Sequence, residues 1–266
     1  MGRAGQELRK AGSVFVKSIK DSYGYLGTVL MNSIMWFAWA VIVVMGASLF
    51  TRSPWVVAGL ALVGTAPATA AASYVVFLVL KREDIGIRDF IVGFRRFGVR
   101  ALGLMAAELL LIAVLLADIV FCFTNKNPVI KAVGGIWIYA LLFVLMMMNY
   151  LIPLVVQQDT GTGKALKRSA LLILDNPFFS ILMSFFNLLV AVVCIVIAPA
   201  FALLFMGILS FLQGNGAVEV LKKYNIHTVP EEEPYTPDIL DTPEIPGIPE
   251  ESSTGERSFN EEEKGV

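Results

Sequence analysis

Long apolar runs separated by short polar connections occupy the chain from residue 28 to residue 221. A helix needs about 20 mostly apolar residues to cross the hydrocarbon core of a bilayer. Runs of that length recur at about 29–50, 54–80, 101–123, 130–156, 178–198 and 200–221. They lack the alternation of apolar and polar residues that is typical of membrane barrels. We therefore predict an all-α polytopic membrane protein with a bundle of about six transmembrane helices.

The division of the last apolar stretch decides between five and six spans. Residues 178–212 carry no charge, and as one helix they would measure about 52 Å, too long for one crossing without extreme tilt. Pro199 lies where a tight external turn would divide the stretch in two. A five-span chain would also place Lys222 and Lys223 on the outer side, so we favour six.

Basic residues fall on alternate connections and predict the orientation. Of the 19 Lys and Arg residues before Pro230, 16 lie in the N-terminal segment, the second and fourth connections and the end of the last run. The exceptions are Arg52, Lys126 and Lys131. Because cytoplasmic loops of membrane proteins are enriched in Lys and Arg, we predict both termini in the cytoplasm.

Each inward connection contains a short amphipathic segment that precedes an outgoing span. Such segments are typical of helices lying in the headgroup layer. Their apolar sides are formed by Leu8, Ala11, Phe15, Ile19 and Ser22, by Ile87, Phe90, Ile91, Phe94 and Phe97, and by Leu166, Ala170 and Ile173. Two interpretations stay open: a threefold repeat of interfacial helix plus transmembrane hairpin, or the basic inner loops that any hairpin protein has.

The C-terminal segment differs sharply from the rest of the chain. The net charge of −1 conceals a segment from residue 230 to 266 with 12 acidic and 2 basic side chains. It is rich in proline and poor in core-forming residues, a composition that cannot offset the entropy lost on ordering. We therefore divide the chain into an N-terminal amphipathic segment (1–27), a transmembrane domain (28–224) and a disordered acidic cytoplasmic tail (225–266).

Polar residues inside the spans are the first candidates for function, because ionisable groups are costly in lipid. Glu108 and Asp118 lie within the third span. They either pair structurally, Glu108 with Arg100 or the amphipathic segment and Asp118 with Lys126 or Lys131, or they line a proton or cation path. The amides of Asn32, Asn149 and Asn187 either hydrogen-bond between helices or form a polar binding cluster.

Other motifs have plain structural interpretations. The second span is rich in Gly and Ala, which predicts close helix packing, and Pro67 should kink it. Residues 161–164 read Gly-Thr-Gly-Lys but lack the remaining phosphate-loop residues, so we expect a helix start capped by Thr160 or Thr162. Cys122 and Cys194 are expected to be free core residues, with a disulfide as the alternative. The pattern nominates no catalytic residue, cofactor, metal site or nucleic-acid partner.

The chain resembles the YesL family of bacterial membrane proteins. The resemblance covers roughly residues 10–224 and rests on Asn32 and Trp36, on 64–71 with Tyr74, on Arg88, Asp89, Phe90, Gly93 and Phe94, and on Ala165, Leu166, Ser169, Asn176 and Pro177. It implies a protein of the bacterial inner membrane that is often encoded beside carbohydrate-uptake ABC transporters. No activity is established for the family, so the resemblance carries over no catalytic residue.

From these features we expect a non-enzymatic accessory or regulatory protein that contacts the lipid bilayer and subunits of a membrane transporter. Its candidate interaction face is cytoplasmic and consists of Arg88, Arg95, Arg96, Arg100, Lys164, Lys167 and Arg168. The alternative is a small-molecule or ion transporter or channel that uses Glu108, Asn149 and Asn187. The sequence indicates no oligomeric state.

Overall fold

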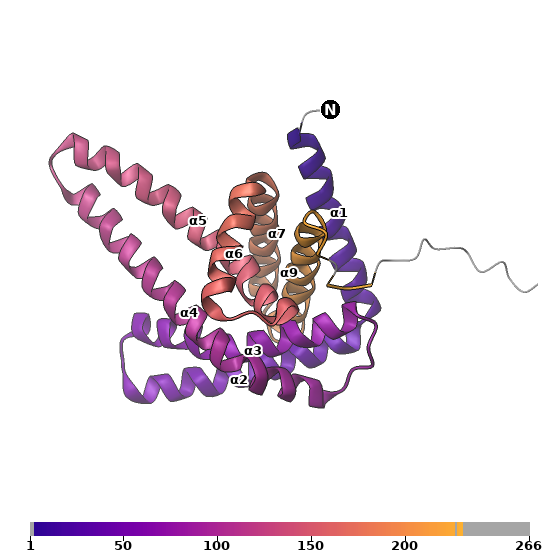
Figure 1. Ribbon diagram of the computed structural model, residues 1–266. Coiled ribbons are helices and arrows are strands. Elements are labelled where there is room, and N and C mark those ends of the chain that lie inside the picture. The colour runs from indigo at the N-terminus through magenta and orange to yellow at the C-terminus, as the bar shows by residue number, and fades with distance from the viewer. Residues whose placement is uncertain (1–2, 227, 231–266) are drawn as a thin grey trace, which may run out of the picture. The chain divides into compact units, whose positions relative to one another are not determined.

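The computed structural model describes residues 3–226 and 228–230, which form nine α-helices and no strand (Figure 1). The helices are α1 (Arg3–Gly24), α2 (Leu26–Phe50), α3 (Pro54–Leu80), α4 (Ile87–Thr124), α5 (Pro128–Gln158), α6 (Thr162–Asp175), α7 (Pro177–Val196), α8 (Ala198–Leu203) and α9 (Phe205–Lys222). Five of them, α2, α3, α4, α5 and α7, are long and apolar enough to cross a membrane. The chain is therefore an all-α protein with the helices of a multi-pass membrane protein, as its sequence predicts.

Helix α4 corrects the predicted boundary between an amphipathic segment and a span. Residues 87–124 form one continuous helix of 38 residues, about 57 Å long at 1.5 Å per residue. No proline interrupts this stretch, and Gly98 and Gly103 are both accommodated inside the helix. A change from amphipathic to uniformly apolar composition is thus not by itself a helix boundary.

The region around Pro199 contains two breaks rather than the single predicted turn. The backbone leaves helical geometry at Ile197 and again at Leu204, with the short helix α8 between them. Pro199 lies in the first turn of α8, where its missing N–H removes no helical hydrogen bond. Helix α9 then runs back along α7, which it contacts. It carries Gln213, Asn215 and Glu219, and it is not among the five apolar helices.

The described helices follow a threefold pattern, and we call the three members of each repeat the leading, the outgoing and the returning helix in their order along the chain. The leading segments are α1, the α4 N-terminal segment (residues 87–100) and α6, and the outgoing helices are α2, the rest of α4, and α7. The returning helices are α3, α5 and α9. Each is followed within three residues by a residue with positive φ: Arg82 (61°), Asp159 (46°) and Asn225 (55°). This shared ending gives the repeat suggested by the sequence a structural counterpart.

Each leading segment packs against the hairpin of another repeat. Helix α1 contacts α7 and α9, where Phe15 stacks on Phe186 with ring centroids 4.5 Å apart. The α4 N-terminal segment packs on α3, and a Cβ at Gly93 would meet the Tyr74 side chain at 2.9 Å. Helix α6 contacts α4 and α5. The three repeats therefore interlock.

The side of α1 that faces the other helices coincides only in part with its predicted apolar side, since Ala11 and Ser22 are buried and Phe15 packs on Phe186. The buried residues are Ala11, Val14, Ser18 and Ser22, whereas Leu8 and Ile19 are exposed. Small side chains let α1 approach α9 closely, and Asn215 of α9 donates hydrogen bonds to Ser18 Oγ (3.2 Å) and Asp21 Oδ2 (3.0 Å). Close packing and amide hydrogen bonds thus decide which face of α1 is buried.

The returning helices form the centre of the described structure. Helices α3, α5 and α9 contact one another, and their inner residues are the most deeply buried. Leu154 of α5 and Leu212 of α9 have no exposed surface. The α4–α5 hairpin, by contrast, extends its tip away from α9 (Figure 1). Burial is therefore concentrated in one helix of each hairpin.

Helix α2 packs tightly on α3 and α9. A Cβ at Gly207 would lie 2.6 Å from the backbone oxygen of Val29, so only glycine fits at this crossing. Trp39 Nε1 donates to the Gly64 carbonyl (2.9 Å), and Trp36 Nε1 donates to Thr69 Oγ1 (3.0 Å). These bonds flank Pro67, which lacks an N–H for the α3 ladder. The small-residue stretch of α3 is thus a packing surface.

Two further predictions need correction at chain junctions. Helix α6 is capped by Gly161, without a side-chain hydrogen bond from Thr160 or Thr162. At the other end, the predicted tail begins too early, because Thr228 Oγ1 donates to Gln157 Oε1 (3.4 Å) and Val229 packs against the core. His227 and residues 231–266, which make up most of the predicted tail, lie outside the described residues.

Candidate functional site

One buried polar residue on each outgoing helix forms the first group of candidate site residues: Asn32 on α2, Glu108 on α4 and Asn187 on α7. Asn32 Nδ2 donates to the Ala72 carbonyl of α3 at 3.3 Å. Asn187 Nδ2 donates to Asn149 Oδ1 of α5 at 2.6 Å. Both amides therefore bind their own outgoing helix to a returning helix, which is the common role of amides between membrane helices.

The amide pair of α5 and α7 belongs to a larger polar contact. Asn149 Nδ2 donates to Ser184 Oγ at 2.6 Å, and one turn closer to the start of α7 Tyr150 OH lies 3.2 Å from Ser180 Oγ. Ser180 Oγ in turn donates to the Asn176 carbonyl at 2.9 Å. The structure thus brings Asn149 and Asn187 together, and their hydrogen bonds are largely made within the protein.

Glu108 differs from the two amides because neither of its carboxyl oxygens has a hydrogen-bond partner among the described residues, whereas each amide leaves only its Oδ1 unpaired and donates through Nδ2. Its side chain is buried, with 3% of the residue exposed. The expected pairing with Arg100 does not form, because Arg100 binds Asp159 instead. Eight residues along a helix separate Glu108 from Arg100 by about 12 Å and turn them about 80° apart, which explains the failure.

The remaining candidates within the predicted spans are Asp118 and the two cysteines. Asp118 is partly exposed, and within the described ranges it forms no ion pair with Lys126 or Lys131. Cys122 and Cys194 are both buried and both free, so the alternative of a disulfide is wrong. Cys122 packs against Gly134 at the tip of the α4–α5 hairpin.

The predicted basic face divides into residues that hold the fold and residues that do not. Arg96 and Arg100 of α4 both bind Asp159 at the end of α5, with N–O distances of 2.8 and 2.5 Å. The hydrogen bond from Arg96, which is the larger cause, and the hydrogen bond from Arg100 both lower the pKa of the Asp159 carboxyl. Next to it, Arg168 of α6 donates to Gln158. These three arginines join α4, α5 and α6.

The other basic residues of this face point to the surroundings. They are exposed and have no ion pair within the part of the chain that the structure describes: Arg88, Arg95, Lys164 and Lys167. On α4, Arg88 and Arg95 share a side of the helix with the exposed apolar residues Ile91 and Val99. The result is a surface of free cations beside apolar side chains.

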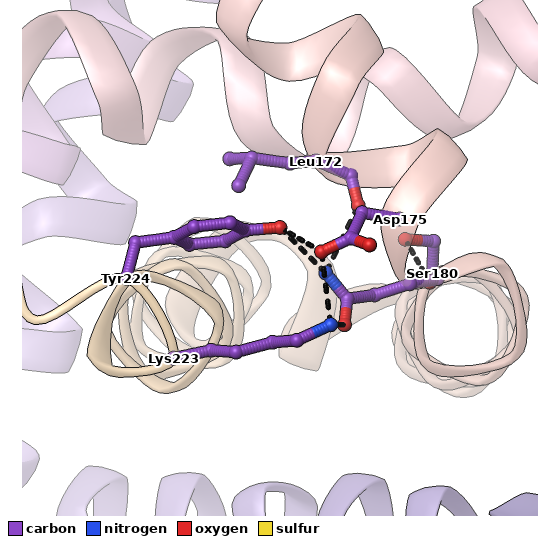
Figure 2. A network of polar contacts seen from close by, with 6 residues as sticks. Leu172, Asp175, Ser180, Lys223 and Tyr224 are labelled. Carbon is purple, nitrogen blue, oxygen red and sulfur yellow. Dashed lines mark hydrogen bonds and ion pairs between the residues drawn. The ribbon is translucent and has the colours of Figure 1, made fainter.

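A polar network that the sequence did not nominate lies where α6 meets α7 (Figure 2). Lys223 Nζ, just past α9, donates to Asp175 Oδ2 at 2.9 Å and to Asn176 Oδ1 at 2.8 Å, and Tyr224 OH donates to Asp175. Burial, which is the larger cause, and the hydrogen bond to Asp175 both raise the pKa of Tyr224. The network ties the end of the last helix to the start of α7 and has a structural role.

A cavity of about 630 Å³ lies among α2, α3, α4, α5, α8 and α9. Its walls are mostly apolar, with Trp36, Phe37, Phe201 and Phe205 among them, and the few polar residues include Gln213. Its size falls within the range of small-molecule pockets. Sequence reasoning missed this cavity because its lining comes from helices far apart in the chain.

The residues that carry the family resemblance have packing roles. Asn32 and Trp36 bind the small-residue stretch of α3, Gly93 allows α4 to approach Tyr74, and Asn176 belongs to the network of Figure 2. They hold the helices together. No group of metal-ligating side chains occurs in residues 3–226 and 228–230.

Comparison with protein families, curated proteins and solved structures finds no match to this chain. The resemblance to the YesL family therefore rests on the motifs alone, and the function must be argued from the arrangement of the residues.

Proposed function

We propose that this chain is a non-enzymatic accessory or regulatory component of the bacterial inner membrane. It binds a subunit of a transporter for carbohydrate uptake through its basic face. In this proposal α9 is a sixth crossing, both termini lie in the cytoplasm, and α1, the α4 N-terminal segment and α6 lie at the cytoplasmic boundary of the bilayer. The resemblance to the YesL family supplies the bacterial inner membrane and the class of partner.

The distribution of basic residues supports this placement in the membrane. The ends of all three returning helices carry them: Lys81 and Arg82 follow α3, Lys164 follows α5 closely, and Lys222 and Lys223 end α9. The tips of the α2–α3 and α4–α5 hairpins carry only Arg52, Lys126 and Lys131. An excess of Lys and Arg at one end of the spans marks the cytoplasmic side.

Exposed apolar residues on the leading segments support their position at the boundary. On α1, Leu8, Val16 and Tyr23 are exposed next to the face that packs on α9. On α6, Leu171 and Leu174 are exposed beside Lys164 and Lys167. Apolar side chains adjacent to cations suit the headgroup layer, where both kinds of side chain find partners.

The proposed role rests on the difference between the basic residues that are bound within the protein and those that are exposed. Arg96, Arg100 and Arg168 are held by Asp159 and Gln158, whereas Arg88, Arg95, Lys164 and Lys167 are exposed and have no ion pair among the described residues. Free cations at an interface favour partners with acidic surfaces and accelerate association. The four free residues are therefore the interaction face, while the three bound ones position it.

The test is purification of the tagged chain from its native host at natural expression in mild detergent, with mass spectrometry of the proteins that co-elute. We expect transporter subunits in stoichiometric amounts with the wild type and their loss with Arg88→Glu/Arg95→Glu. Lys126→Glu/Lys131→Glu, which reverses two charges at the opposite hairpin tip, is the matched control and should retain the subunits. Wild-type protein that elutes without a partner, or equal recovery with both double variants, would contradict the proposal.

A second candidate is a small-molecule or ion transporter, favoured by the unpaired carboxyl of Glu108 and by the cavity among α2, α3, α4, α5, α8 and α9. Reconstituted protein would then release a trapped solute or ion from liposomes, and Glu108→Gln would change the rate. Liposomes containing the protein that leak no faster than empty ones for ions and sugars would exclude this candidate.

A further inference from the structure

The position of Glu108 in the α4–α5 hairpin follows from contacts on both sides of it. The helices are antiparallel, since Cys122 packs against Gly134 near the tip and Arg100 binds Asp159 at the other end. This register places Glu108 level with about residues 148–151 of α5. On the other side, the neighbouring Leu109 reaches Gly59 of α3, whose Cβ would lie 3.6 Å from Leu109 Cδ2. Glu108 is thus well inside the hairpin and away from its polar ends.

No cation on the surrounding helices is placed to neutralise Glu108. Helices α2 and α3 contain no Lys, Arg, Asp or Glu, and α5 contains only Lys131, near the opposite end from Asp159. On α4 itself, Arg96 and Arg100 are bound to Asp159, and Asp118 lies ten residues away, about 15 Å along the helix. The charged residues of α6, which also contacts α4, are Lys164, Lys167, Arg168 and Asp175. None of them forms an ion pair with Glu108, since neither of its oxygens has a partner among the described residues.

The neighbouring tyrosines do not donate a hydrogen bond to Glu108 either. Tyr150 OH pairs with Ser180 Oγ at 3.2 Å, and Tyr139 is largely exposed. Tyr74 of α3 packs against Gly93 and Phe97, more than two helical turns from Glu108. The carboxyl is therefore buried without a counter-charge and without a hydrogen-bond donor. An ionised carboxylate in such a place costs far more than the neutral acid.

We propose that Glu108 is a proton-binding site within the membrane, occupied by a proton in the folded state and emptied only when α4 and α5 separate enough to admit water. Binding converts the carboxylate and one proton into the neutral acid, so no further ligand is required. The buried amides of α2 and α7, Asn32 and Asn187, carry no exchangeable charge. The second repeat therefore differs from the other two in having an outgoing helix that can respond to proton concentration. This inference rests on the burial of Glu108 in a membrane-spanning helix and is independent of the partner proposed for the basic face.

The first test is reaction with dicyclohexylcarbodiimide, an apolar reagent that adds to neutral carboxylic acids in the lipid phase. The acid adds across a C=N bond and the product rearranges to a stable N-acylurea, which peptide mass spectrometry locates. With the full chain in liposomes, we expect the adduct at Glu108 in the wild type and in Asp118→Asn, and no adduct at position 108 in Glu108→Gln. An adduct confined to other carboxyls, or none at all, would overturn the proposal.

The second test detects the bound proton directly and does not depend on entry of the carbodiimide into the protein. The infrared difference between wild type and Glu108→Gln at neutral pH should contain the carbonyl band of a neutral acid, and the difference between wild type and Asp118→Asn should not contain the same band. Gln matches the neutral acid in size and charge, so the variant should fold with an unchanged thermal midpoint. Carboxylate bands in the Glu108 difference, in place of the acid band, would show an ionised side chain and reject the inference.

Discussion

The outgoing helices α2, α4 and α7 and the returning helices α3 and α5 are all apolar enough to cross a membrane, but their surroundings differ. In their most apolar 18-residue stretches, the buried share is 67% in α3 and 50% in α5, against 11% in α2, 17% in α4 and 33% in α7. Helix α9, the third returning helix, has 12 of its 18 residues buried. Hydropathy measures the preference for leaving water and does not distinguish lipid from protein as the new surroundings. The polar residues of α9 show the difference, because Asn215 is tolerated where a protein partner receives its hydrogen bonds.

The largest expected contrast comes from the same truncation in the two kinds of helix. Leu154→Ala removes a side chain with no exposed surface from α5 and should destabilise the protein by about 2–5 kcal/mol. Leu110→Ala on α4, where the residue is 67% exposed, should cost at most about 0.5 kcal/mol. Unfolding of both variants in the same detergent measures the difference. Equal losses would show that the α4 surface is packed as tightly as the centre.

A smaller contrast is expected from enlarging a glycine. Gly207→Val on α9 forces side-chain atoms against the Val29 backbone and should destabilise the protein by about 1–3 kcal/mol or more. Gly103→Val on α4 is the matched control, because nothing lies within 4 Å of a Cβ there. Thermal midpoints of the two variants report the result, and a Gly207 variant as stable as the control would refute the close crossing of α2 and α9.

The thermal stability that comes from the ion pairs between α4 and α5 should depend on pH. Hydrogen bonds from Arg96 and Arg100 lower the pKa of Asp159, so its carboxylate stabilises the fold above the pKa that aspartate has in the unfolded chain. That contribution is lost as the pH falls through the lowered value. The thermal midpoint should therefore fall on acidification by more in the wild type than in Asp159→Asn. Asp84→Asn, at an exposed residue, should keep the wild-type dependence, and the same slope in all three proteins would contradict the assignment.

The smallest effect is expected at the end of α3. Arg82 adopts φ 61°, a left-handed conformation that is unfavourable for residues other than glycine by about 1–2 kcal/mol. Arg82→Gly removes this strain but increases the freedom of the unfolded chain by about 0.5–1 kcal/mol. A stabilisation of up to about 1 kcal/mol should appear in chemical unfolding, whereas Arg88→Gly inside α4 should destabilise. Destabilisation by Arg82→Gly would indicate a contact made by the arginine side chain.

Much of the fold follows from the sequence because apolar runs and breaks are local signals. Pro54 and Pro128 begin helices within about two residues of the predicted starts, and α2, α3 and α5 match their predicted spans within a few residues, whereas α4 begins 14 residues before its predicted span. The amides of Asn149 and Asn187 bind each other, as amides within spans are expected to do. The predicted pairing of Arg100 failed for a non-local reason, because its partner is Asp159, 59 residues further along the chain, and no local pattern specifies that pairing.

The sequence predicted which types of residue belong to the candidate site, but it did not predict how they are arranged. An acid within a span is visible in the sequence, but the absence of a partner for Glu108 depends on the register of α4 against α5 and on the capture of Arg100 elsewhere. The division of the basic face into bound and free cations likewise depends on the left-handed residue Asp159, which brings its carboxyl to Arg96 and Arg100. The cavity needs helices from all three repeats and has no signature in the chain.

The most direct test of the difference between the two sets of helices is labelling in intact membranes with a lipid-soluble probe that generates a carbene on illumination, mapped by peptide mass spectrometry. We predict heavy labelling of exposed residues such as Leu110 and Val114 on α4 and Leu188 on α7, and little labelling anywhere in residues 206–221 of α9. Labelling of α9 at the level of α4 would place the returning helix against lipid and contradict the account.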